Sequence, residues 1–167
     1  VAFSPAARKA YESAGFEVQT TRLASIPFPH LLPELSSENL LSLALQMEEL
    51  IRQSDFEYVS LGPALPETPL AYALIPEAIA ATQNIFFSGS MTTANGGVSL
   101  PATRACAQVI HDTAPLSPDG FANLRFAALA NVPAGAPFFP ASYHQGSEPS
   151  FALAMEGADL AVQAFSG

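Results

Sequence analysis

The sequence predicts an α/β fold in which five mainly parallel strands alternate with helices. Apolar residues recur with a helical period in several stretches, and short runs rich in apolar and β-branched residues lie between them. Two of these runs, residues 85–87 and 124–130, are almost entirely apolar, which is typical of strands buried on both faces of a sheet. Strands separated by helices pair in parallel through crossover connections.

The first elements are a helix and a strand. Ser4 and Pro5 predict a helix start, because serine caps a helix well and proline fits its first turn. Gly15 predicts the end of this helix. Residues 16–23 predict a strand because they are rich in Phe, Val and Thr, and a proline-rich connection follows at 27–33.

The clearest helix begins at Ser36 or Ser37 and extends to Arg52. Its apolar side chains follow the helical period, at Leu40, Leu43, Ala44, Met47, Leu50 and Ile51. Residues 56–61 predict the second strand, which the pair Gly62-Pro63 ends.

The middle of the chain predicts a helix, a strand and a second helix. Pro76 favours the start of a short helix to Thr82, because proline is tolerated in a first turn and not in a helix interior. Residues 85–87 predict the third strand. A glycine-containing loop at 88–97 then leads to a helix that Ser99 caps.

The last third predicts two further strands and a helix. The strand at 124–130 is followed by a long loop at 131–146. Residues 151–155 predict the fifth strand, and residues 158–165 predict the last helix.

The composition suggests that something covers part of this chain. Apolar residues make up 49% and charged residues only 13%, against roughly 25% charged residues in an ordinary domain. We therefore expect more polypeptide or another subunit against its surface. The net charge is −9 and the six basic residues are scattered, so we expect no nucleic-acid partner.

The chain has one cysteine, Cys106, which excludes an internal disulfide and fits a reducing cytoplasm. No apolar run approaches the roughly 18 residues of a membrane span, and Val1 does not open a basic-then-apolar signal sequence. We expect a cytoplasmic protein without a membrane partner.

Ligands of parallel α/β sheets bind outside the carboxyl ends of the strands. Polar residues concentrate at these predicted ends, and the strand bodies are nearly bare of them. The five places are Thr20 to Arg22, Ser60 to Gly62, Ser88 to Asn95, Asn131 to His144, and Glu156.

The loop at 88–97 joins a predicted strand to a helix start, where backbone N–H groups and hydroxyls can hold a ligand. We expect ligand contacts from Ser88, Ser90, Thr92 and Asn95. The loop has neither a Walker-type lysine nor the glycine spacing of a dinucleotide site. The alternative is a turn that uses Gly and Asn for their tolerance of positive φ.

The loop at 131–144 holds three prolines and two phenylalanines, which suits a preorganised pocket. His144 could act as a general acid or base, with Glu156 as its carboxylate partner. Asn131 and Tyr143 are candidate ligand contacts. The alternative for His144 is a hydrogen-bonded structural histidine.

The remaining candidates are weaker. His111 and His30 are interpreted as structural, and Cys106 as a small buried apolar side chain instead of a nucleophile. No His and Cys cluster has zinc spacing, so no metal site is expected, and no motif assigns a cofactor.

Several segments resemble the uncharacterised "domain of unknown function 711" family, in order and spacing over nearly the whole chain. They are Gly15-Phe16-Glu17-Val18-Gln19-Thr20-Thr21-Arg22, Pro27-Phe28-Pro29, Phe86-Phe87-Ser88, Ala130-Asn131-Val132 and, most specific, Pro137-Phe138-Phe139-Pro140-Ala141-Ser142-Tyr143-His144. Asn131, Tyr143 and His144 match the family motif, and the resemblance itself implies no role for these three residues.

The resemblance implies a fold related to the ten-stranded α/β barrel of glycyl-radical enzymes such as pyruvate formate-lyase, built from two five-stranded halves. Residues 1–167 would then be a single α/β domain, about half of the barrel and the N-terminal part of a longer protein. The barrel cysteine of those enzymes lies on a central loop, whereas Cys106 lies on a predicted helix. We therefore expect no radical chemistry.

Three functions fit these observations. The first is an enzyme that acts on a small polar metabolite, with His144 as acid or base and Glu156 orienting it. The second is a non-catalytic metabolite-binding or sensor protein. The third is an assembly subunit whose apolar surface is its working part.

Overall fold

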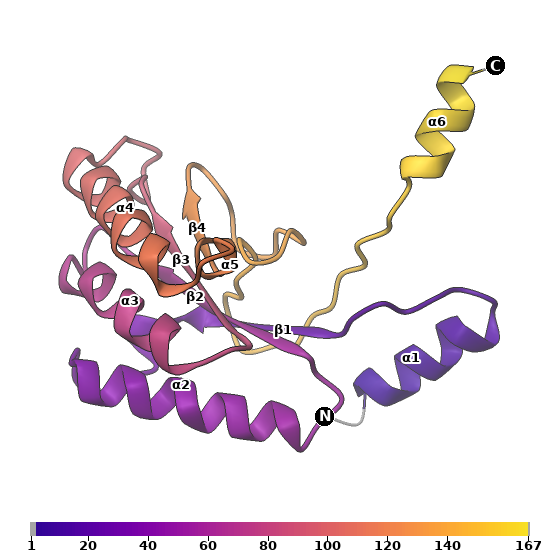
Figure 1. The fold of residues 1–167 in the computed structure, drawn as a ribbon, viewed down its shortest axis with the longest axis horizontal. Helices are drawn as coiled ribbons and strands as arrows, with labels where there is room; N and C mark the ends of the chain where they lie inside the picture. The colour runs from indigo at the N-terminus through magenta and orange to yellow at the C-terminus, as the bar shows by residue number, and fades with distance from the viewer. Residues whose placement is uncertain (1–2, 167) are drawn as a thin grey trace.

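Four parallel strands form the sheet of this protein, in the order β1-β2-β3-β4. The computed structural model describes residues 3–166 (Figure 1). Its elements are α1 (Phe3–Ser13), β1 (Arg22–Pro27), η1 (Phe28–His30), α2 (Ser37–Arg52), β2 (Tyr58–Ala64), α3 (Leu70–Ala81), β3 (Ile85–Ser90), α4 (Leu100–Thr113), η2 (Ala114–Leu116), α5 (Phe121–Leu124), β4 (Phe126–Leu129) and α6 (Ala158–Ser166). The α/β class and the parallel pairing are confirmed.

The core lies between the sheet and the helices α2, α3 and α4. Val59, Leu61, Ile85 and Phe87 alternate along β2 and β3 and belong to this buried cluster. Their helix partners are fully or almost fully buried, and include Leu40, Ala44, Ile51, Tyr72, Ile75, Ile79, Cys106 and Val109. Successive side chains of a strand point to opposite faces, so the intervening residues face away from the helices.

We call this second surface the open face. Its residues are Arg22 of β1, Tyr58 and Ser60 of β2, and Phe86, Ser88 and Ser90 of β3. The register places Arg22 beside Tyr58 and Ser60 beside Phe86. Since none of α2, α3 and α4 lies on this side, another part of the chain has to cover it.

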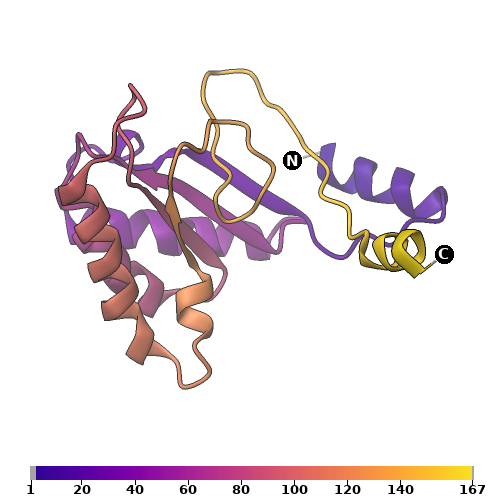
Figure 2. The same cartoon turned by 90° about the horizontal axis from the view of Figure 1, so that it is seen from above.

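The loop at 131–144 covers the open face, on the side of the sheet opposite to α3 and α4 (Figure 2). The Phe139 ring packs against Phe86 with 4.8 Å between centroids, and lies 6.4 Å from the Tyr58 ring. The Ser60 hydroxyl donates to the carbonyl of Pro140 at 2.9 Å. Phe138 is 73% exposed, so of the two phenylalanines in the loop Phe139 is the one that packs on the described sheet.

Several predicted element boundaries differ from the structure. β2 continues through Gly62-Pro63 to Ala64, β3 extends to Ser90, and β4 begins only at Phe126, after helix α5. The first strand covers Arg22–Pro27 and not 16–23, because pairing with β2 fixes its position and Phe16 remains exposed. Helix α3 begins at Leu70, and Pro76 lies inside it. Burial of Ala71, Tyr72 and Ile75 against the sheet offsets the hydrogen bond that the proline cannot make.

The prediction of a fifth strand at 151–155 is wrong. Those residues form neither a helix nor a strand, and every residue from 145 to 166 is exposed. A strand needs a hydrogen-bonded neighbour, and none of the described residues pairs with this segment. Helix α6 forms where it is predicted, and Figure 1 shows it projecting away from the sheet.

Arg125 fastens the start of β4 to the end of α3. Its guanidinium donates to the carbonyl of Thr82 at 2.6 Å and to the carbonyl of Ile79, and the residue is only 7% exposed. A cation at a helix C-terminus satisfies carbonyls that the helix leaves free. Burial lowers the pKa of Arg125, and Glu48 partly opposes this.

Replacing Arg125 with Met is expected to lower the free energy of unfolding by about 2–4 kcal/mol, because two buried carbonyls lose a charged donor. Urea denaturation measures the change. The control is Arg104→Met, which removes an exposed arginine of α4 and should change stability by less than about 0.5 kcal/mol. Equal stability of the two variants would contradict the role given to Arg125.

Phe139→Ala is expected to cost about 1–3 kcal/mol, because the half-buried ring loses its contacts with Phe86 and Tyr58. Its neighbour supplies a matched control, since Phe138→Ala removes a largely exposed ring and should cost less than about 0.5 kcal/mol. The comparison uses urea denaturation and limited proteolysis of the loop. If Phe138→Ala costs as much as Phe139→Ala, the loop does not pack on the sheet as described.

Candidate functional site

The carboxyl ends of β3 and β4 bring three of the predicted ligand contacts together. The Ser90 hydroxyl donates to the carbonyl of Thr92 at 2.8 Å. The Thr92 hydroxyl accepts from the backbone N–H of Asn131 at 3.2 Å. We call Ser90, Thr92 and Asn131 the rim cluster. Because all four strands are parallel, this cluster lies at the edge of the sheet where the strand ends meet, as the sequence predicts.

One further hydrogen bond and one backbone feature position the rim cluster. The Tyr72 hydroxyl of α3 donates to the carbonyl of Ser90 at 2.6 Å. Asn131 has a φ of 54°, a left-handed conformation that Asn adopts more readily than most residues. Its side-chain oxygen is directed toward Gly96, where it would be the nearest atom to an added Cβ, at 3.9 Å. The side chain of Asn131 therefore faces the loop that follows β3.

This loop forms a tight turn at its tip. The N–H of Thr93 donates to the carbonyl of Gly97 at 2.8 Å, and the N–H of Gly96 donates to the carbonyl of Thr93 at 2.8 Å. Gly96 has a φ of 77°, so the turn uses glycine for its conformational freedom. Asn95 is exposed at the tip. Ser88 and Ser90, in contrast, belong to β3 itself.

Ser88 is fully buried on the open face, and its hydroxyl makes no hydrogen bond within residues 3–166. A buried hydroxyl without a partner costs about 1–3 kcal/mol. Native structures rarely leave such a group unpaired, so each case needs an explanation. Ser88 precedes the rim cluster by two residues, and its side chain points to the same face of the sheet as that of Ser90.

His144 and Glu156 lie near opposite ends of β1. The N–H of His144 donates to the carbonyl of Ser25 at 2.9 Å, toward the carboxyl end of that strand. Glu156 accepts from the side chain of Gln19 at 3.3 Å, before the strand begins. Within the described residues, no hydrogen bond or ion pair joins the two side chains. Without a fifth strand, the chain does not carry Glu156 to the rim.

Tyr143 holds the covering loop closed. Its hydroxyl donates to the carbonyl of Val132 at 3.0 Å, and its carbonyl accepts from the N–H of Gly135 at 2.8 Å. The hydroxyl predicted to contact a ligand is thus used inside the loop.

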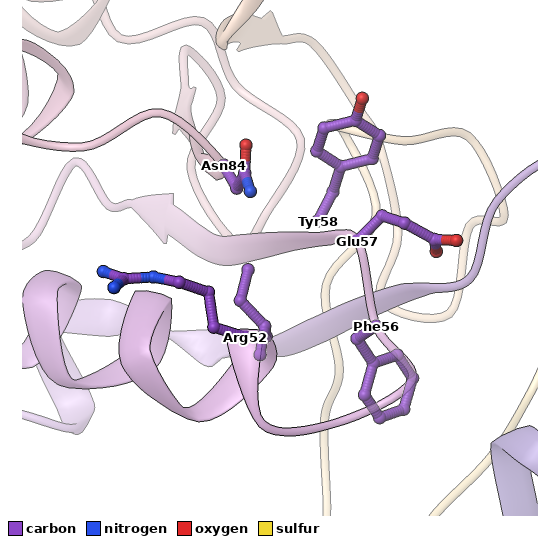
Figure 3. A pocket seen from close by; sticks show the side chains of 6 residues that line it. Arg52, Phe56, Glu57, Tyr58 and Asn84 are labelled. Atoms are coloured by element: carbon purple, nitrogen blue, oxygen red, sulfur yellow. The ribbon is translucent and has the colours of Figure 1, made fainter.

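Two pockets lie at the amino ends of the strands instead. One has a volume of about 250 Å³ and is lined by Ile51, Arg52, Phe56, Glu57, Tyr58 and Asn84 (Figure 3). The other has a volume of about 430 Å³ and shares Tyr58 and Asn84 with the first. Neither pocket is lined by His144 or Asn131. The residues that line these pockets were not predicted, because ligands were expected only at the carboxyl ends of the strands. The polar pair Gln83-Asn84, directly before a buried strand, is a sequence signal that could have indicated them.

The structure also shows where the weaker candidates Cys106 and His111 lie. Cys106 is 1% exposed in the core, and burial raises its thiol pKa to about 11, which supports a packing role. His111 is exposed, with Nδ1 at 3.1 Å from the Asp112 carboxylate. Residues 3–166 contain no group of three His, Cys, Asp or Glu side chains placed to bind a metal. No helix among them has the length and apolar character needed to cross a membrane.

Comparison with known proteins gives relatives without an assigned activity. A UPF0210 protein of Pyrobaculum islandicum is 28% identical over 148 residues, which are 84% of this chain and 32% of the relative. A UPF0210 protein of Methanosarcina acetivorans is 27% identical over 143 residues, 81% of this chain and 31% of the relative. This chain thus spans about a third of the length of these curated relatives. No solved structure matches it.

The family model described as "Uncharacterised ACR (DUF711)" matches residues 2–167, which is nearly the whole sequence. The resemblance seen in the residues around Asn131 and His144 is therefore confirmed, and the chain belongs to the DUF711 family.

Proposed function

We propose that this chain is part of a cytoplasmic α/β-barrel protein that binds a small polar metabolite at the carboxyl ends of its strands. The observation that carries the proposal is the rim cluster, where Ser90, Thr92 and Asn131 converge from two strand ends. Neutral hydroxyl and amide groups of this kind recognise hydroxyl, amide or carboxylate groups of a ligand. The unpaired Ser88 hydroxyl adds a donor on the same face.

We further propose that the protein is an enzyme in which His144 serves as general acid or base. An imidazole can both accept and donate a proton in catalysis, and the covering loop carries His144 to β1. Glu156 is the weaker candidate, because it lies near the other end of that strand. Cys106 lies inside α4 and not on a loop, which supports a reaction without radical chemistry. The alternative is a metabolite sensor with the same rim cluster and no turnover.

A thermal-shift screen of small polar metabolites tests the binding proposal on the purified protein. A stabilising ligand should bind roughly tenfold more weakly to Asn131→Gly, because about one hydrogen bond to the ligand is lost. Glycine is chosen because it accepts the left-handed φ of Asn131. His111→Ala, on the exposed surface of α4, is the matched control and should bind normally. An Asn131→Gly variant with unchanged affinity would exclude the rim cluster.

The same ligand separates the enzyme from the sensor. Incubation of the ligand with the protein, followed by NMR, shows conversion for an enzyme and an unchanged ligand for a sensor. Conversion should fall by about 10²–10⁴ in His144→Ala while ligand affinity changes only a few fold.

We propose that polypeptide outside residues 1–167, or another subunit, covers the apolar side chains between residues 151 and 165. This part of the chain carries large exposed apolar residues, at Phe151, Leu153, Met155, Leu160, Val162 and Phe165. Patches of this kind mark interfaces. The rest of a barrel or another subunit is the proposed cover, since the relatives are about three times as long as this chain.

In the whole protein, Phe165→Asp is therefore expected to lower stability by at least about 2 kcal/mol or to dissociate subunits, because a charge replaces a buried ring. Thermal unfolding and light scattering measure these effects. Ser150→Asp adds the same charge at an exposed polar position and serves as the control. If both variants keep the stability and mass of the wild type, Phe165 is not covered.

A further inference from the structure

We propose that the amino ends of the strands carry an oxyanion-binding site built on Arg22, independent of the rim cluster. The ligand is a small metabolite that bears a carboxylate or phosphate group. Arg22 begins β1 and pairs in register with Tyr58, the first residue of β2. Both residues lie at the edge of the sheet that holds the two pockets, opposite to the rim cluster.

The Arg22 guanidinium is held in position by two aromatic rings. Its central carbon lies 5.1 Å from the centroid of the Phe139 ring and 5.9 Å from that of the Tyr58 ring. Its Nε donates to the Thr20 hydroxyl at 2.9 Å. Stacking on rings fixes the plane of a guanidinium and leaves its outer N–H groups free to donate. Little side-chain freedom would therefore be lost when an anion binds.

No carboxylate neutralises Arg22 among the described residues. Among the other arginines only Arg8 and Arg52 form such ion pairs in the described residues, and Arg22 differs from the unpaired, exposed Arg104 in lying against two aromatic rings. Arg8 pairs with Glu57 at 2.7 Å, and Arg52 pairs with Glu49 at 2.9 Å. An ordered, unpaired guanidinium in a chain of charge −9 is matched to an external oxyanion, which it can bind through two parallel hydrogen bonds.

The larger pocket gives the body of the ligand a place beside Tyr58, whose ring the Arg22 guanidinium faces. Arg22 itself is exposed and lies outside the lining of this pocket. Tyr58 contacts the arginine on one side and lines this pocket of about 430 Å³, a volume in the range of metabolite sites. The lining includes the side chains of Gln83, Asn84 and Arg125 and no acidic residue. Arg125 adds a second positive charge at the same edge.

The carboxylates near this edge already have partners. Asp55 pairs with Arg8 at 3.6 Å, and Glu156 accepts from the side chain of Gln19 at 3.3 Å. Glu48 accepts the backbone N–H groups of Gln83 and Asn84 at 2.7 and 2.8 Å. Glu57 lines the smaller pocket but pairs with Arg8, and Figure 3 shows its side chain directed away from Asn84. None of these carboxylates forms an ion pair with Arg22, so its charge is available to an external anion.

Isothermal titration with inorganic phosphate and with malonate, at constant ionic strength set by chloride, tests the site on the purified protein. At least one anion should bind the wild type, and its affinity should fall about tenfold or more in Arg22→Met, which keeps the apolar contact with Phe139. Arg22→Lys keeps the charge but loses the planar fork, so it should bind with intermediate affinity. Whichever anion binds more tightly identifies the group that the metabolite carries.

Two controls separate this site from other effects. Arg104→Met removes an exposed arginine elsewhere and should bind the anion as the wild type does. Phe138→Ala, which removes the largely exposed ring next to Phe139, should also bind normally. The rim cluster is tested separately, by Asn131→Gly with its own ligand, so failure of the rim cluster and failure of this site are distinguishable. Absence of binding by the wild type, or equal weakening in Arg22→Met and Arg104→Met, would overturn the proposal. Circular dichroism checks that each variant is folded, and Arg22→Lys carries the test if Arg22→Met is not.

Discussion

The parallel pairing of β1 to β4 is the constraint on which the rest of this structure depends. Parallel strands need crossover helices, and here α2, α3 and α4 all lie on one face of the sheet. The other face carries the side chains of Tyr58, Ser60, Phe86 and Ser88. Exposing its aromatic rings to water would cost free energy. The loop at 131–144 covers it, with Phe139 on Phe86 and Ser60 bonded to Pro140. The same pairing gathers the strand ends at two edges, which is why both candidate sites lie where they do.

Local sequence signals predicted the elements that depend on local physics. The Ser36 cap accepts from the N–H of Asn39, and the amphipathic pattern behind it forms α2 as expected. Elements that depend on distant partners were harder to place. Residues 16–20 have strand-forming side chains, but β2 pairs with Arg22–Pro27. Residues 151–155 have the composition of a strand and find no neighbour to pair with. Pro76 argued against a helix interior, yet tertiary burial around it decides otherwise.

The residues of the candidate site also fall into some that the sequence could predict and others that depend on distant partners. Ser90, Thr92 and Asn131 could be predicted because the carboxyl ends of parallel strands must meet. The partnership of His144 with Glu156 rested on a fifth strand, and without that strand the chain keeps them apart. Arg125 could not be recognised as a clamp, since its acceptors Ile79 and Thr82 lie more than forty residues earlier. Arg22 was predicted to lie at the carboxyl end of a strand. It begins β1 instead, so it lies at the amino edge of the sheet.

The covering loop connects these two edges, which matters for how they can work together. It leaves the sheet at Asn131 in the rim cluster and reaches the amino edge at Phe139, beside Arg22. It then returns to β1 through the N–H of His144. Pro133, Pro137 and Pro140 restrict its backbone, so displacement at one end cannot be absorbed freely in the middle. One stiff segment therefore sets the position of groups at both edges. Residues 137–144, which carry the most specific part of the family resemblance, lie in this segment.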